Sequence, residues 1–222
     1  IDYIESLHST KINRVSIGIQ SLDDDILKFI NRRHTSDAAK CCVRNLLASG
    51  YENVSIDLIY GIPGQTIDSW KHTVDEAITL NVKHISAYNL SFEEGTAMYR
   101  FIDKSPDEET CISMYNYLCD TLKNNGFEHY EISNFAKDGY RSKHNSVYWH
   151  GGEYLGIGAG AHSFNGNQRF ENKEYKVGGD GTLNWEQKTE TLTEQDKYNE
   201  LIITALRTKE GIDTIKIKEI YI

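Results

Sequence analysis

The sequence predicts an α/β fold built around a parallel sheet. Short apolar, β-branched runs alternate with longer segments of helical periodicity between residues 14 and 133, and polar residues gather where the runs end. Repeated strand-then-helix units of this length predict right-handed crossovers, in either an open doubly wound sheet or part of a barrel. In both architectures, ligands bind at the C-terminal ends of the strands.

Four apolar runs are the expected strands. They comprise residues 14–21 (RVSIGIQS), 53–61 (NVSIDLIYG), 84–91 (HISAYNLS) and 129–133 (HYEIS). Short runs rich in β-branched and aromatic residues fit a pleated, buried surface, which favours strands at these positions.

Helices are expected between these strands and near the end of the chain. Their segments are residues 23–32, 36–51, 66–80, 105–127 and 192–212. The first has an acidic opening turn, which suits the positive end of the helix dipole, and then apolar residues at helical spacing. The last is amphipathic and begins at a Thr or Asp.

Several residues mark where these helices begin and end. Gly50 is a natural C-terminal stop for the second helix, because glycine adopts the left-handed conformation without steric cost. Ser105 and Glu108 have the spacing of a capping box, with Pro106 at the first helical position. Gly211 is the expected stop of the last helix.

The composition indicates a globular chain that can bury a core and form one domain or one and a half. Of its 222 residues, 39% are hydrophobic, and no apolar run approaches the roughly 20 residues that cross a bilayer. No signal peptide opens the chain, so the cytoplasm is the expected location. The net charge of -9 argues against a nucleic-acid partner, because such proteins usually carry a basic face.

The four cysteines follow no spacing typical of metal or cluster ligands. Cys41 and Cys42 are adjacent, and Cys111 and Cys119 lie eight residues apart within one expected helix. We therefore expect them to be thiols packed in the core.

Asp57 interrupts the apolar run of the second strand. A buried, unpaired carboxylate costs several kcal/mol or changes its protonation, so an aspartate there has either a structural salt bridge or a ligand. The strand-end rule brings it near Gln20 at the end of the first strand, and near residues 88–91 and Glu131 at the ends of the later ones. Polar groups should therefore converge at the C-terminal rim of the sheet.

A glycine-rich and aromatic segment follows at residues 143–163. Its string of Gly156, Gly158 and Gly160 lacks the spacing and the downstream acid of a dinucleotide-binding fingerprint. The pattern favours close approach of backbone segments instead.

This segment leads to the expected domain organisation. Residues 1–163 should form a β/α part together with the glycine-rich segment, and residues 164–188 are polar enough to be a linker. Residues 189–222 should open a small, mainly helical C-terminal domain.

Several motifs resemble the radical S-adenosylmethionine (SAM) enzymes of the HemN and HemW group. The stretches are RVSIGIQS, NRRH, SIDLIYGIPGQT, HISAY, HNSVYW, YLGIGAGAHS and LTEQDKYNELIITALRTKEGI, which together extend over nearly the whole chain. The resemblance implies that this chain holds the second half of a partial (β/α)6 radical SAM barrel and the start of a C-terminal domain.

The resemblance also implies a binding site for SAM. This ligand presents a carboxylate, a ribose diol and an adenine, so it needs a bidentate cation, acceptors for hydroxyl groups and an apolar slot. Arg32 matches the position that meets the carboxylate, Gln20 and Asp57 match positions around the ribose, and Ile59 matches the wall of the adenine slot. Asp57 would then be charged because the sugar is its partner.

The cluster motif of the group, C-x-x-x-C-x-x-C, has no counterpart in this sequence. The resemblance therefore implies that the ligands of a 4Fe-4S cluster precede residue 1 in a longer protein, and that this chain alone is inactive. Whether the longer protein is an enzyme stays open.

Two features favour the HemW side of the group. They are the HNSVYW stretch at residues 144–149 and the PGQT turn at residues 63–66. HemW proteins resemble haem chaperones that pass haem to acceptor proteins. The alternative is the coproporphyrinogen III oxidase side, which decarboxylates propionates by a radical mechanism. A plain structural or nucleotide-binding β/α protein is a third possibility.

The glycine-rich segment carries residue types that suit haem. Haem needs aromatic walls, close-approach glycines, an axial nitrogen and a cation. Tyr148 and Trp149 supply aromatic rings, and His144, His150 and His162 are candidate iron ligands. The expected partners are haem or a porphyrinogen, and proteins that accept haem.

Overall fold

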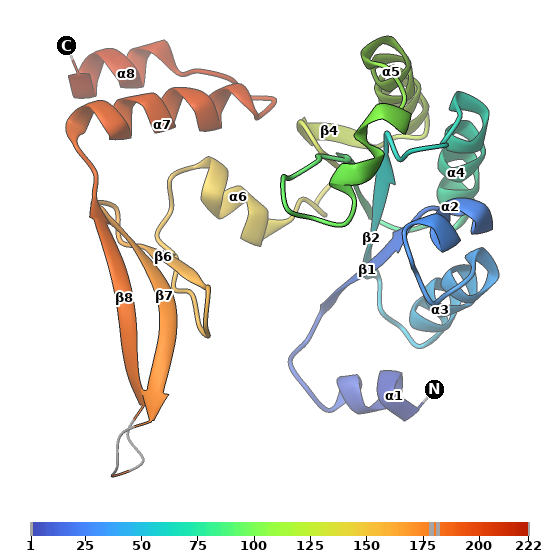
Figure 1. The fold of residues 1–222 in the computed structure, drawn as a ribbon, viewed down its shortest axis with the longest axis horizontal. Coiled ribbons are helices and arrows are strands. Elements are labelled where there is room, and N and C mark those ends of the chain that lie inside the picture. The colour runs from blue at the N-terminus through green and yellow to red at the C-terminus, as the bar shows by residue number, and fades with distance from the viewer. Residues whose placement is uncertain (1, 178–179, 181–182, 222) are drawn as a thin grey trace. The chain divides into compact units, whose positions relative to one another are not determined.

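The computed structural model describes residues 2–177, 180 and 183–221, and the chain divides into two compact units, Ile1–Arg141 and Ser142–Ile222. Figure 1 shows the order of their helices and strands along the chain.

The first unit alternates strands and helices, as the sequence predicts. Its elements are α1 (Asp2–His8), β1 (Arg14–Gln20), α2 (Asp24–Phe29), α3 (Ser36–Ala48), β2 (Asn53–Tyr60), α4 (Ile67–Thr79), β3 (His84–Asn89), a 3₁₀ turn (Tyr99–Lys104), α5 (Glu108–Asn124), β4 (Glu128–Glu131) and β5 (Asn134–Ala136). The strands form one sheet in the order β1-β2-β3-β5-β4, with β1, β2 and β3 parallel.

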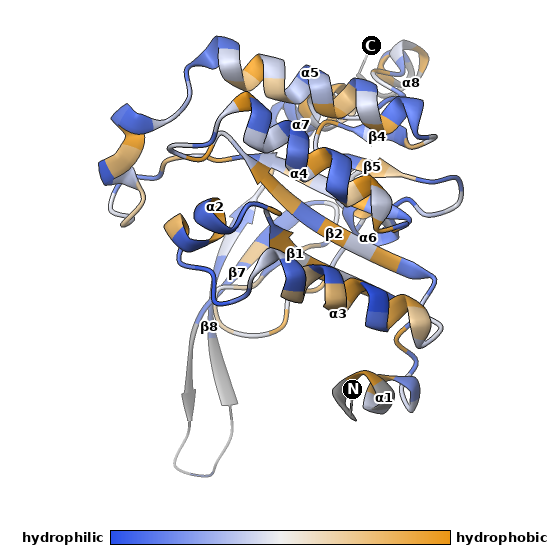
Figure 2. Ribbon diagram, turned by 90° about the vertical axis from the view of Figure 1, so that its right-hand side faces the viewer, coloured by the Kyte–Doolittle hydropathy of each residue, from blue (hydrophilic) through white to orange (hydrophobic). Residues whose placement is uncertain are grey.

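The two faces of β2 have different surroundings. Val54, Ile56 and Leu58 are fully buried and belong to the main core with α3, α4 and α5. Asp57 and Ile59 alternate with them and therefore point to the opposite face, since successive side chains of a strand lie on opposite sides. Figure 2 shows the mainly hydrophobic β2 beside the amphipathic α3 and α4.

Helices α3 and α4 cover one face of the sheet (Figure 1). Both begin at a threonine, Thr35 and Thr66, whose hydroxyl accepts a hydrogen bond from a backbone N–H of the first turn. Trp70 of α4 is fully buried, and its indole N–H donates to the Met114 carbonyl of α5 over 2.8 Å. This bond joins two neighbouring helices across the core.

The end of the sheet differs from the predicted run of parallel strands. Strand β5 lies between β3 and β4 and is antiparallel to both. It has three residues, all buried, and follows β4 through a short turn. An antiparallel return needs only such a short connection, whereas a further parallel strand would need another crossover helix.

Two local predictions were wrong. Helix α5 is capped by Asp107, whose carboxylate accepts from Thr110 N over 2.8 Å, and not by Ser105. An aspartate one position before the helix satisfies the free N–H groups directly, so the predicted capping box is not used. Cys41 and Cys42 lie exposed on α3 instead of in the core.

The second unit combines helices with a small antiparallel sheet. It contains α6 (Lys143–Trp149), β6 (His162–Phe164), β7 (Gln168–Val177), β8 (Leu183–Thr191), α7 (Glu194–Leu206) and α8 (Thr214–Tyr221). The strands lie in the order β6-β7-β8. Strands thus occupy much of residues 164–188, where the polar composition predicts a linker. The last long helix also stops five residues before Gly211.

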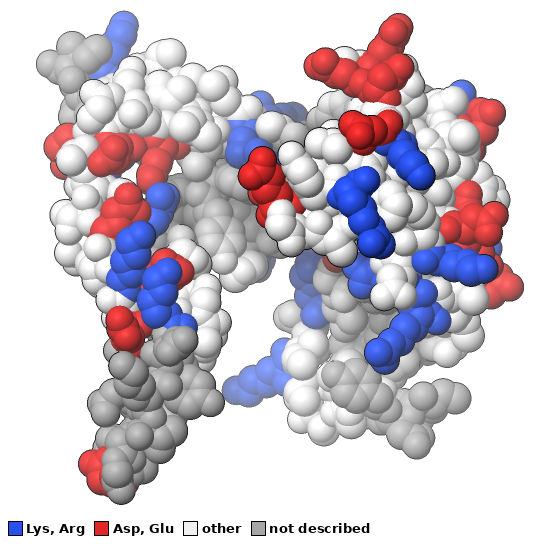
Figure 3. Space-filling model, viewed as in Figure 1, with Lys and Arg blue, Asp and Glu red and all other residues white. Residues whose placement is uncertain are grey.

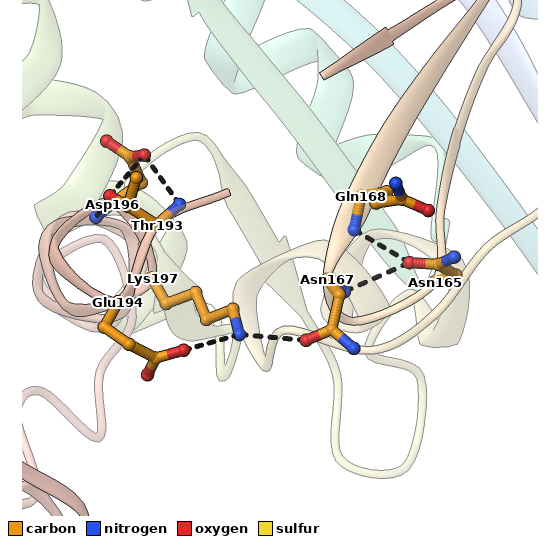
Figure 4. Close-up of polar contacts among 7 residues, drawn as sticks. All are labelled: Asn165, Asn167, Gln168, Thr193, Glu194, Asp196 and Lys197. Atoms are coloured by element: carbon orange, nitrogen blue, oxygen red, sulfur yellow. Dashed lines mark hydrogen bonds and ion pairs between the residues drawn. The ribbon is translucent and has the colours of Figure 1, made fainter. Parts of the chain in front are cut away.

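A polar network fixes the start of α7 (Figure 4). The Thr193 hydroxyl accepts from Asp196 N, and the Asp196 carboxylate accepts from Thr193 N over 2.9 Å, which completes a capping box. Lys197 donates to Asn167 Oδ1 and to Glu194 Oε1, both over 2.9 Å. The helix is therefore tied to the turn that precedes β7.

We expect the first unit to lose stability when the pH falls from 7 to 5. His84 is fully buried between Ser55 Oγ at 2.7 Å and Tyr130 Oη at 2.8 Å, and burial, with the nearby Arg14, lowers its pKa from 6.5 to about 3. Below pH 6.5 His84 is protonated in the unfolded chain but stays neutral in the folded chain. The free energy of unfolding therefore falls as the pH falls, and it levels off near pH 3. The loss should be about 2 kcal/mol between pH 7 and pH 5.

Urea unfolding at both pH values measures this loss, and the His84→Gln variant should lack this part of the pH dependence. A histidine NMR titration in which the His84 signal moves near pH 6.5 in the folded protein would contradict the prediction.

Candidate functional site

The face of the sheet that lies away from the helices carries a short polar row. Asp57 of β2 is in register with Gly18 of β1 on one side and with Ser86 of β3 on the other. The Ser16 hydroxyl donates to the two carboxylate oxygens over 3.3 and 3.4 Å. Within the described residues, Asp57 has no salt bridge, so the predicted structural partner for its charge is not found there.

Gln20 joins this row through an unusual backbone conformation. A bulge separates it from Gly18, and its φ of 65° lies in the left-handed region that non-glycine residues rarely adopt. A Cβ at Gly18 would lie 2.5 Å from Gln20 Nε2, so the side-chain amide lies directly over the glycine. The structure therefore places Gln20 beside the strand position that pairs with Asp57.

Arg32 and Ile59 line one pocket of about 260 Å³ in the first unit. The other lining residues are Ile30, Asn31, Ile62, Leu90 and Met98. Arg32 is exposed, and it forms no ion pair with any residue in the described parts of the chain. A guanidinium beside apolar walls suits a ligand that has both an anionic group and a flat apolar ring.

The four predicted SAM residues thus fall into two neighbouring pairs. Gln20 and Asp57 share the open face of β1 and β2, while Arg32 and Ile59 share the pocket. Asp57 and Ile59 are two residues apart on the same face of β2, which connects the pairs. Gln20 and Asp57 are not among the residues that line the pocket.

His34 is a site residue for which the sequence suggests no role. Its Nε2 lies 3.2 Å from the Ile19 carbonyl oxygen, which also accepts from Ser21 N over 2.7 Å. The contact joins the loop of Arg32 to the bulged end of β1, next to Gln20. The only sequence signal is its place in the NRRH stretch, two residues after Arg32.

The other strand-end residues behave differently from one another. Tyr88 is 42% exposed and pairs in register with Ile59, so it borders the same rim. Glu131 is buried and accepts from Ser133 N over 3.0 Å and from the Asn134 amide. The Glu131 carboxylate is therefore bound within the turn between β4 and β5. The sequence predicts instead that it joins the polar residues at the rim of the sheet.

The glycine-rich segment in the second unit makes the close backbone approach that its pattern favours. A Cβ at Gly156 would lie 2.2 Å from the His162 carbonyl oxygen. The Asn172 side chain donates to the carbonyls of Gly156 and Gly158 over 3.3 and 3.1 Å, and its backbone oxygen accepts from Gly160 N. The buried Asn172 therefore forms hydrogen bonds with all three of these glycines.

We expect Gly156→Ala to destabilise the second unit by about 1–3 kcal/mol, because the new methyl group meets backbone atoms that cannot rotate away. Thermal unfolding measures the change. The neighbouring Ile157 is 86% exposed, so Ile157→Ala serves as the control and should leave the melting temperature nearly unchanged. Equal melting temperatures for the Gly156 variant and the wild type would refute the packing described above.

The three candidate histidines have separate surroundings. His144 Nε2 lies 3.1 Å from Tyr148 Oη, and His150 Nδ1 lies 2.7 Å from the Ser146 carbonyl oxygen. His162 lines a pocket together with Arg169 and Glu171, and neither His144 nor His150 is part of that lining. They do not gather around one point.

The described residues contain neither a metal-ion site nor a membrane-spanning helix. No group of three or more His, Cys, Asp or Glu side chains is placed to hold a metal ion. No helix in the described ranges has the length and apolarity needed to cross a bilayer.

Several known proteins are similar to this chain in sequence, in fold or in both. A family model described as the radical SAM superfamily matches residues 1–77. The heme chaperone HemW of Lactococcus lactis subsp. lactis (strain IL1403) is 39% identical over 175 residues, which cover 77% of this chain and 46% of that protein. The heme chaperone HemW of Bacillus subtilis (strain 168) is 37% identical over 173 residues, with coverages of 76% and 46%. The chain thus spans about half the length of these relatives.

A solved structure of coproporphyrinogen III oxidase (HemN) from Escherichia coli, a radical SAM enzyme, matches this chain over 98% of its residues and over 55% of the residues of the oxidase. The TM-score is 0.81 at 21% sequence identity, so this likeness shows the fold. It confirms the prediction of an α/β fold with part of a radical SAM barrel.

The parallel strands and the outer helices define a β/α fold, and the family model over residues 1–77 places the chain in the radical SAM superfamily. Within that superfamily, the chain belongs to the HemN and HemW group.

Proposed function

We propose that this protein acts in haem metabolism as a radical SAM protein that binds haem and passes it to other proteins. The observation that supports this most is the identity of 39% and 37% to two heme chaperones over three quarters of the chain. Haem and haem-accepting proteins are then its partners. Location in the cytoplasm stays a prediction.

The first unit supplies the residues that would hold SAM. Arg32, exposed and without an ion pair among the described residues, would take the carboxylate, and Ile59 in the same pocket would line the adenine slot. The Asp57 carboxylate, whose side-chain contacts among the described residues are the long ones to Ser16, would accept from ribose hydroxyls beside the Gln20 amide. SAM bound near a reduced 4Fe-4S cluster supplies radical chemistry.

The described residues do not fit the cluster itself. Cys41 and Cys42 lie on α3, Cys111 and Cys119 lie on α5, and all four are free. We therefore assign the cluster ligands to residues outside this chain, in a longer protein.

The alternative function is that of a coproporphyrinogen III oxidase. The fold likeness to the Escherichia coli oxidase favours it, although the sequence identity there is 21%. A chaperone needs a site for the whole haem, whereas an oxidase needs to place propionate side chains at the radical centre.

A haem titration of the complete protein tests the proposal. We expect a saturable Soret band, transfer of the haem to an apo-haemoprotein, and no decarboxylation of coproporphyrinogen III by the cluster-loaded protein. Conversion to protoporphyrinogen IX, or the absence of haem binding, would favour the oxidase.

Nucleic acid is not among the proposed partners. On the face shown in Figure 3, basic side chains lie among acidic ones, and the net charge is -9. A nucleic-acid partner usually requires one continuous basic surface.

A further inference from the structure

The second unit contains a pocket of about 400 Å³ that the radical SAM site does not use. This volume falls within the range of about 300–1,000 Å³ that is usual for small-molecule sites. Its walls come from the end of α6, the loop after it, strands β6 and β7, and α7.

The walls are largely aromatic. Tyr148, Tyr154 and Phe164 form a chain of ring contacts, with centroids 4.8 Å apart for the first pair and 6.1 Å for the second. Trp149 adds a fourth ring to the lining, and Gly151 and Gly152 leave backbone exposed beside it. Such a wall suits a large, flat, apolar ring system.

His150 brings an imidazole to the same pocket in a defined orientation. It is exposed, and its Nδ1 lies 2.7 Å from the Ser146 carbonyl oxygen, to which only a protonated nitrogen can donate. The Nε2 atom is then the unprotonated one, and it has no partner among the described residues. A histidine that donates through one nitrogen to a carbonyl is the usual arrangement of an iron ligand.

The lining of the pocket also includes two cations and one carboxylate. Arg169 Nη1 lies 2.8 Å from Glu200 Oε1, which leaves the other guanidinium N–H groups as donors. Lys197 also lines the pocket, and its ammonium group has one N–H left after its bonds to Asn167 Oδ1 and Glu194 Oε1. The buried indole N–H of Trp149 has no acceptor in the described parts of the chain. These donors suit a ligand that carries carboxylates.

We propose that this pocket is the haem site of the second unit, with His150 Nε2 as the axial ligand and Arg169 and Lys197 facing the propionates. The proposal rests on the haem-binding function proposed above and adds its location. It selects His150 among the three candidate histidines, because His144 does not line the pocket and His162 lines another one.

Titration of the complete protein with ferric haem, followed by Soret absorbance and electron paramagnetic resonance, tests the assignment. We expect His150→Ala to weaken haem binding at least about tenfold and to change the spin-state signature, because an axial ligand matters at least as much as its supporting contacts. Free imidazole should restore the signature in His150→Gly. His162→Ala is the matched control and should bind like the wild type.

A second titration compares haem with its dimethyl ester, which has no free carboxylates. The wild type should bind haem more tightly than the ester, and Arg169→Gln should reduce that preference. Normal binding by His150→Ala together with loss of binding in His144→Ala would overturn the pocket assignment and leave the haem function intact. A wild-type protein that binds no haem would instead remove the proposed function itself.

Discussion

Trp70→Ala should lower the free energy of unfolding of the first unit by about 3–5 kcal/mol, the range for large aromatic side chains removed from a core. Trp70 is fully buried and packs against Tyr60 of β2, with the two ring centroids 5.5 Å apart. The truncation leaves a cavity between α4 and the sheet. It also removes the indole donor to the Met114 carbonyl, and the loss of this buried hydrogen bond adds to the cost.

Urea unfolding followed by circular dichroism measures this change. Trp70→Phe keeps most of the ring but loses the N–H, so its smaller loss separates the cavity from the hydrogen bond. Ile112→Ala on α5, at a side chain that is 52% exposed, is the control and should change stability by less than about 0.5 kcal/mol. A loss below about 1 kcal/mol for Trp70→Ala would mean that α4 and α5 do not pack as described.

The sequence predicts the central strands and helices well because the spacing of their apolar residues fits only one kind of element. Val54, Ile56 and Leu58 alternate with Asp57 and Ile59, and a period of two places the first set against the helices and the second on the open face. The buried side chains of α3 and α4 recur at helical spacing, and a threonine precedes each helix.

The missed elements lack such a pattern. Strand β5 has three residues, which is too short for periodicity to show, and its place between β3 and β4 depends on pairing between distant segments. Strands β7 and β8 are rich in charged and amide residues, so their composition resembles a linker. Pairing of the two strands with each other, with β6 beside β7, satisfies their backbone groups without a long apolar run.

The site shows the same division between local pattern and long-range geometry. Strand alternation alone places Asp57 and Ile59 on one face, whereas the left-handed Gln20 and its contact with Gly18 depend on a bulge that no residue type announces. Arg32 has no local signal, and its candidate role came from the resemblance to radical SAM proteins. The structure adds that it shares a pocket with Ile59.

Arg32→Ala should weaken SAM binding to the complete, cluster-loaded protein by about 2–4 kcal/mol, roughly 30- to 1,000-fold in Kd, if the proposed site is correct. A guanidinium can donate two parallel hydrogen bonds to a carboxylate, and the described residues offer it no competing ion pair. Arg32→Lys should recover part of the affinity, because it restores the charge without the planar fork.

The adjacent Arg33 provides the matched control. It is exposed on the same loop with the same charge, but it does not line the pocket, so Arg33→Ala should change Kd less than about threefold. Calorimetric titration with SAM gives both affinities without depending on turnover. His34→Ala should weaken binding less than Arg32→Ala, because it loosens the loop but leaves the cation. Equal losses for the two arginine variants would indicate a general effect of positive charge and would remove Arg32 from the proposed site.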